Sequence, residues 1–160
     1  MSRATTNVRV PRPRTGHAVL DLLNQSRACL AESASATTAC ERYAAAHLAA
    51  LRAGAAVLAA RARAESGGSG ARPGRSRPRG PRNVWTVLAT IAPELAEWAD
   101  FFAAGAAKRA AAEAGLPGAA TAREADDLLR DAEAFLGLVC AVLGLPYQRP
   151  LSEVVVTLAG

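Results

Sequence analysis

Residues 40–63 of the chain read CERYAAAHLAALRAGAAVLAARAR. Alanine has the highest helix propensity of any residue, and no proline interrupts this run, so it predicts one long helix. Thr38 and Glu41 have the spacing of a capping box, which satisfies backbone donors at a helix start, so the helix begins there and runs to about Ala64. Small residues recur every four positions along it: Ala46, Ala50 and Gly54. A neighbouring helix can approach closely along that stripe.

Three further helices follow from the same kind of pattern. Apolar residues at spacings of three, four and seven predict a helix over about 17–32. Another spans 83–115, and Pro93 makes it kink or restart. A second capping box at Thr121 opens a helix that continues to Leu143. The fold class is therefore all-α, a four-helix up-and-down bundle over residues 16–145.

Large side chains for the core are concentrated in the third helix. It carries both tryptophans and two of the three phenylalanines: Trp85, Trp98, Phe101 and Phe102. Aromatic residues at helical spacing are typical of a bundle core, and we assign all four to it.

Length and composition limit the remaining fold classes. The chain has 160 residues, of which 51% are hydrophobic and 4% aromatic, which suits one helical domain. The longest uncharged stretch, residues 134–148, is 15 residues long and contains two glycines and a proline, so we expect no membrane span. No secretory signal follows the N-terminal arginines, which predicts a cytoplasmic protein. The three cysteines match no metal or redox spacing, and we expect free thiols, no metal site and no cofactor.

The net charge of +5 conceals an uneven distribution. Residues 1–15 hold four arginines and no acid, and residues 61–82 hold seven arginines and one glutamate, so the rest of the chain is acidic. Residues 66–82 read SGGSGARPGRSRPRGPR, a composition that predicts a disordered linker between helices two and three. We likewise expect residues 1–15 to be a disordered basic arm and residues 146–160 to be a tail. The linker arginines that could contact nucleic-acid phosphates are Arg72, Arg75, Arg77, Arg79 and Arg82. The alternative is a solubilising spacer.

One pair of residues could carry chemistry. Arg42 and His47 are separated by four residues in the first turns of the second helix. An arginine can hold a scissile phosphate, and a histidine can move a proton at neutral pH, so the pair could cleave RNA. Five positions place the two side chains about 140° apart on a helix, so a symmetric dimer would be needed to complete a site. The alternative is a surface arginine and a histidine packed among alanines.

This pattern resembles the HEPN superfamily, the higher-eukaryote and prokaryote nucleotide-binding domain. Residues 40–63 and GLPGAATAREADDLLRDAEAFL, residues 115–136, are similar to the second and fourth helices of an actinobacterial HEPN branch, the SAV-type family. Together with APELAEW, residues 92–98, the resemblance covers about residues 17–143. It implies a helical bundle, frequent homodimers, binding of RNA or nucleotides and, in many members, a metal-independent RNase. In such an RNase, Arg42 would contact the phosphate and His47 would be the general acid or base. Two departures are Tyr43, where active members usually carry a polar residue, and the early position of the motif.

Three functions remain open from the sequence. The first is a non-catalytic or weakly catalytic nucleic-acid- or nucleotide-binding accessory protein that self-associates; the resemblance also suggests a link to the DNA damage response. The second is a metal-independent endoribonuclease that uses Arg42 and His47 across a homodimer. The third is a helical adaptor whose acidic face docks a protein partner.

Overall fold

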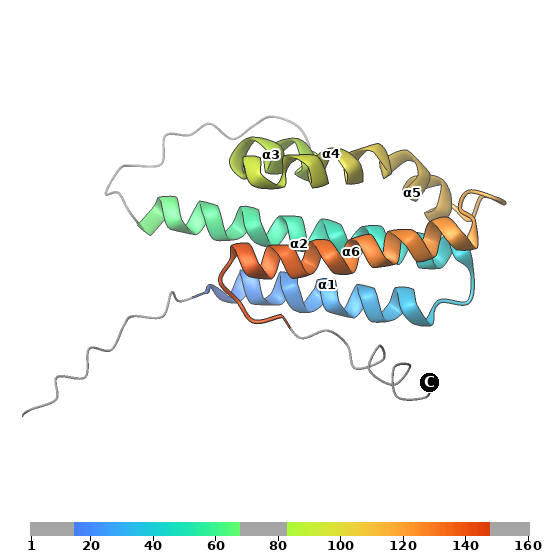
Figure 1. Cartoon of the computed structure of the whole chain (residues 1–160), viewed down its shortest axis with the longest axis horizontal. Helices are drawn as coiled ribbons and strands as arrows, with labels where there is room; N and C mark the ends of the chain where they lie inside the picture. Colours follow the sequence, from blue (N-terminus) through green and yellow to red (C-terminus); the bar gives the residue numbers. More distant parts are fainter. Residues whose placement is uncertain (1–14, 68–82, 148–160) are drawn as a thin grey trace, which may run out of the picture.

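Helix α2 (Ala39–Gly67) is the central element of the structure (Figure 1). The structure is a computed structural model, and it describes residues 15–67 and 83–147. Helices α1 (His17–Ser35) and α6 (Ala122–Val142) run alongside α2, and all three pack on one another. Helices α3 (Val84–Ile91), α4 (Ala96–Ala104) and α5 (Ala106–Glu113) cover the side of α2 that faces away from α1. The predicted all-α bundle is confirmed, and the described part of the chain contains no strand.

Both predicted capping boxes are present. At the start of α2, the Glu41 amide donates to Thr38 Oγ1 at 3.2 Å, and the Thr38 amide donates to the Glu41 carboxylate at 3.3 Å. At the start of α6, the Glu124 amide donates to Thr121 Oγ1 at 3.2 Å, and the Thr121 amide donates to the Glu124 carboxylate at 2.8 Å. Each box satisfies backbone donors that a helix start leaves unpaired, so the sequence located both starts correctly.

The helix predicted over residues 83–115, with a kink or restart at Pro93, is divided at one further position. This segment consists of α3, a 3₁₀ turn at Pro93–Leu95, α4 and α5. The first break is at Pro93, as expected, because proline has no backbone N–H to donate. The second break is at Gly105, between α4 and α5, where the chain passes close to α2. A Cβ at Gly105 would lie 3.1 Å from Tyr43 Oη. The close approach explains why glycine suits this position.

The core has an alanine side and an aromatic side. Ala46, Ala50 and Ala53 of α2 are completely buried. Gly54 faces α3, where a Cβ would lie 3.3 Å from the Trp85 ring, so the predicted stripe of small residues is where a neighbouring helix packs. The aromatic side is built from stacked or tilted rings: Trp85, Trp98, Phe102 and Phe135.

Phe101 does not belong to this core. Its assignment to the core from helical spacing is wrong, because it is 48% exposed on the outer side of α4. The buried positions of this segment recur at spacings of three and four through the break at Pro93, and Phe101 is not one of them: they are Trp85, Leu88, Ala92, Leu95, Ala99 and Phe102.

Some predictions fall largely on residues outside the described ranges: the disordered arm at 1–15, the linker at 66–82 and the tail at 146–160. Where the ranges overlap, α2 includes Ser66 and Gly67 and so extends past the predicted start of the linker. Tyr147 packs its ring against Gly137 of α6.

By length and composition alone, α2 could cross a membrane. Of its most apolar window, 56% is buried inside the bundle. The apolar character of α2 is therefore accounted for to a large extent by its central position in the core.

Candidate functional site

His47 lies inside the bundle. It is 1% exposed and is enclosed by the rings of Trp85 and Phe102, whose centroids lie 5.9 and 6.0 Å from that of the imidazole, both edge-on. Its Nε2 atom is 2.9 Å from the carbonyl oxygen of Phe102. That carbonyl lies in the last turn of α4, where it also accepts from the amide of Gly105. The imidazole of His47 therefore gives the carbonyl of Phe102 a second hydrogen-bond donor and joins α2 to α4.

This contact fixes the protonation of the ring. A carbonyl can only accept, so Nε2 carries a proton, and in the neutral ring Nδ1 is therefore unprotonated. Nδ1 is buried and has no hydrogen-bond partner among the described residues. Burial lowers the pKa of His47 below its ordinary value of 6.5, and the Phe102 carbonyl opposes this only in part. His47 is a neutral core histidine at physiological pH.

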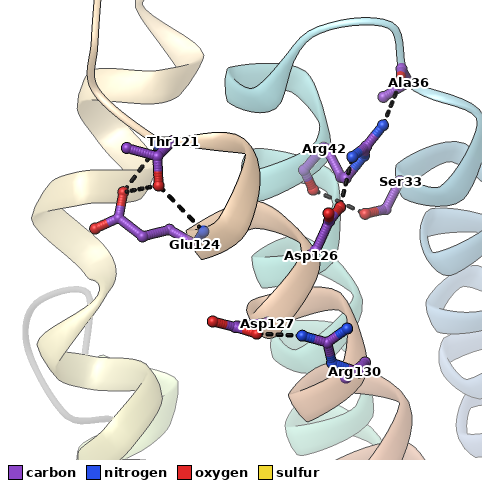
Figure 2. Close-up of polar contacts among 8 residues, drawn as sticks. All are labelled: Ser33, Ala36, Arg42, Thr121, Glu124, Asp126, Asp127 and Arg130. Carbon is purple, nitrogen blue, oxygen red and sulfur yellow. Dashed lines mark hydrogen bonds and ion pairs between the residues drawn. The ribbon is translucent and has the colours of Figure 1, made fainter.

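Arg42 is held by two other parts of the bundle (Figure 2). Its guanidinium lies 2.5 Å from the Asp126 carboxylate of α6 and donates to the carbonyl oxygen of Ala36, in the loop between α1 and α2, at 3.2 Å. The backbone carbonyl of Arg42 accepts from Ser33 Oγ at 2.8 Å. The side chains of Arg42 and Asp126 remain 26% and 47% exposed. Arg42 therefore ties the α1–α2 connection to α6.

The structure does not bring Arg42 and His47 together at an open surface. Arg42 points toward α6, whereas His47 points toward α4, in agreement with the wide angle expected between them on one helix. A second copy of the chain docking on the outside would meet Arg42 but would not reach an imidazole that is 1% exposed. The pair in this conformation supplies structural contacts and presents no accessible proton donor to a phosphate.

Charged groups of α5 and α6 around this pair form ion pairs. Arg109 and Glu113, whose charges act on His47, pair with each other at 2.7 Å. Lys108 of α5 forms an ion pair with Glu124 of α6, which also closes the second capping box. Lys108, followed by the Thr121 backbone and hydroxyl, lowers the pKa of Glu124 from 4.5 to about 2. Burial raises the pKa of Tyr43, a core residue of α2 that lies next to Arg42 in the sequence. The Lys108–Glu124 pair therefore joins α5 to the start of α6.

Sequence reasoning missed the partners of both residues. Asp126 carried a signal, because it was one of several acids in the first turns of the fourth helix, but helix-dipole stabilisation explained it equally well. The Phe102 carbonyl carried no side-chain signal at all. The predicted nucleic-acid contacts Arg72, Arg75, Arg77, Arg79 and Arg82 lie outside the described residues.

Comparison with known proteins identifies one family. The model of the SAV_6107-like HEPN family matches residues 33–140, about two thirds of the chain, from the end of α1 into the last turn of α6. The match includes Arg42, His47 and both capping boxes. No curated protein and no solved structure matches the chain.

Proposed function

The chain belongs to the SAV_6107-like HEPN family, and on that premise we propose that it is a nucleic-acid- or nucleotide-binding accessory protein that does not cleave RNA with Arg42 and His47. Membership supports nucleotide- or RNA-directed binding in general. The choice between binding and cleavage rests on the environment of the two motif residues.

The observation that carries the proposal is the burial of His47. A general acid or base must come within hydrogen-bond distance of the proton that it transfers. The imidazole is 1% exposed, and its protonated nitrogen is occupied by the Phe102 carbonyl. Exposing the imidazole would break that hydrogen bond and remove His47 from its contacts with two aromatic rings. An RNase that used His47 would have to break these contacts in every turnover.

Charge distribution supports the linker as the binding element. The described residues carry nine basic and thirteen acidic side chains, so the bundle as a whole repels a polyanion. Five arginines are concentrated between residues 72 and 82. A guanidinium can donate two parallel hydrogen bonds to phosphate oxygens, and binding to phosphates releases counterions from the nucleic acid. We propose that the linker arginines contact the phosphates of the nucleic acid and do not recognise its sequence.

The test is binding and cleavage of a fluorescein-labelled single-stranded 20-mer RNA in EDTA. We expect the RNA to stay intact and to bind with an affinity that falls as salt rises, with a log–log slope of up to about −3.5 for five phosphate contacts. Replacement of Arg72, Arg75, Arg77, Arg79 and Arg82 by serine should abolish most of the binding. A matched control removes five arginines from the bundle instead, by serine replacement of Arg27, Arg52, Arg63, Arg123 and Arg130. Equal losses in both variants would refute the linker assignment, and cleavage abolished by His47→Ala in a folded protein would establish the endoribonuclease instead.

Self-association and a role in the DNA damage response are also part of the proposal. HEPN membership supports association between copies in general. Light scattering during size-exclusion chromatography tests the homodimer directly: a mass near 33 kDa is expected from a chain of 16.5 kDa, and a mass of one chain across the micromolar range would refute it.

For the damage response, we expect deletion of the gene to sensitise its host to DNA-damaging agents.

A further inference from the structure

A shallow groove of about 350 Å³ lies between α4 and α6, and neither Arg42 nor His47 lines it. It is lined by Glu97, Trp98 and Phe101 of α4 and by Asp131 of α6, which we call the α4–α6 groove. Two of these side chains are aromatic and two are acidic. No basic residue lines it.

The aromatic side of the groove is rigid and partly exposed. The Trp98 ring stacks on Phe102 with centroids 5.9 Å apart and lies 5.6 Å from Phe135, both of which are completely buried. Phe101 meets Trp98 edge-on at 6.2 Å and is 48% exposed. Phe101 is the one aromatic side chain among the large apolar residues that are exposed in the described part of the chain. Since the core fixes the indole in place, the groove needs little ordering before it binds.

The two carboxylates are free to pair with an incoming cation. Among the described residues, neither Glu97 nor Asp131 has an ion-pair partner. Arg130 is adjacent to Asp131 in sequence but pairs with Asp127. Partial burial, and next the charge of Asp127, raise the pKa of Asp131, which means that its negative charge is poorly compensated. An external cation would relieve this cost.

We propose that the α4–α6 groove binds an arginine side chain from a basic segment of a partner protein. A guanidinium is planar, stacks on aromatic rings and donates to carboxylates at the same time, which suits this combination of groups better than an ammonium does. A nucleic acid is disfavoured here because its phosphates would meet two unpaired carboxylates. The groove is near the lower end of the roughly 300–1,000 Å³ range of ligand pockets, so it fits one long side chain with its flanking backbone.

The assignment gives the molecule two surfaces of opposite charge. It goes beyond the proposed nucleic-acid binding, because the linker arginines would contact phosphates while α4 and α6 hold a basic protein. Failure of one does not imply failure of the other, since the residues involved do not overlap.

The probe is a fluorescein-labelled decapeptide of alternating glycine and arginine, measured by fluorescence anisotropy on the full chain. We expect binding that weakens about five- to tenfold in Glu97→Gln/Asp131→Asn, which removes two ion pairs, and about two- to fivefold in Phe101→Ala, which removes a cation–π contact. The control variant Asp21→Asn/Glu32→Gln removes the same charge from exposed positions of α1 and should bind like the wild type. A decapeptide with citrulline in place of arginine should bind far more weakly.

Three outcomes would overturn the proposal. Equal weakening in the α1 control would mean that the peptide responds only to net charge. Equal binding of the citrulline peptide would exclude recognition of a cation. Binding that appears only after the linker arginines are replaced by serine would show that the chain's own linker occupies the groove in place of a partner. Circular dichroism of each variant verifies that the bundle is intact.

Discussion

The imidazole of His47 and the backbone carbonyl of Phe102 are joined at 2.9 Å, and the same carbonyl accepts from the amide of Gly105 at 3.1 Å. One oxygen at the end of α4 thus receives a donor from α2 and a donor from the α4–α5 junction. The contact makes His47 a structural residue at the point where the chain changes direction. Four predictions follow from this arrangement and its neighbours.

Replacement of His47 by alanine should lower the free energy of unfolding by about 2–4 kcal/mol. The change removes a buried hydrogen bond, leaves the Phe102 carbonyl with one donor fewer and opens a cavity between two aromatic rings. Urea unfolding followed by circular dichroism measures it. His17, which is exposed, provides the matched variant: His17→Ala should change stability by less than about 0.5 kcal/mol. Similar small effects at both positions would argue against a structural His47.

Stability should fall on mild acidification because of His47. Its pKa is ordinary, near 6.5, in the unfolded chain and lower in the folded protein, so the unfolded state binds more protons between these two values. The stabilisation by neutral His47 is therefore complete above pH 6.5 and is lost as the pH falls toward the folded pKa, at up to about 1.4 kcal/mol per pH unit. Urea midpoints between pH 8 and pH 5 measure the slope. His47→Leu should flatten it, whereas His17→Gln should leave it unchanged from the wild type.

Arg42 and Asp126 should be coupled in stability. Because both side chains are partly exposed, their ion pair is expected to contribute only about 0.5–1 kcal/mol. A double-mutant cycle with Arg42→Gln and Asp126→Asn measures this coupling energy, and added salt should reduce it. Single and double variants whose effects are strictly additive would mean that the pair does not form in solution.

A side chain at Gly105 should destabilise the junction between α4 and α5. The backbone there has a φ of −81°, which any residue tolerates, so the cost of Gly105→Val is steric, from contact with Tyr43 and His47. We expect about 1–3 kcal/mol. Gly67→Val is the comparison, because a Cβ at Gly67 meets nothing within 4 Å. A Gly105→Val protein as stable as Gly67→Val would contradict the close approach.

Local patterns in the sequence predicted the starts of helices well where the capping residues are close together in the sequence. Both capping boxes form because Thr38 with Glu41, and Thr121 with Glu124, satisfy donors within one turn. The break at Gly105 was not predictable in this way, since it depends on Tyr43, which is distant in sequence. The exposure of Phe101 was predictable, because the buried positions Leu95, Ala99 and Phe102 follow one helical spacing that leaves Phe101 out.

The sequence singled out Arg42 and His47 as a pair, but their surroundings were predictable only in part. Spacing alone indicated that Arg42 and His47 point in different directions from α2. The spacing could not indicate that His47 is buried against α4, because its hydrogen-bond partner is the backbone carbonyl of Phe102. Every residue has a backbone carbonyl, so the sequence does not mark this partner. The acidic residues of the fourth helix offered several partners for Arg42, and only the packing of α6 on α2 selects Asp126.

The accessibility of His47 is the most direct test of the account, and the chain has just two histidines to compare. The measurement is the rate of modification of each imidazole by diethyl pyrocarbonate in the folded protein, followed by mass spectrometry of proteolytic peptides. His17 is expected to react quickly and His47 to be protected until the protein is unfolded in urea. Modification of both histidines at comparable rates under native conditions would contradict a sealed His47 and would restore the Arg42–His47 pair as a candidate RNase site.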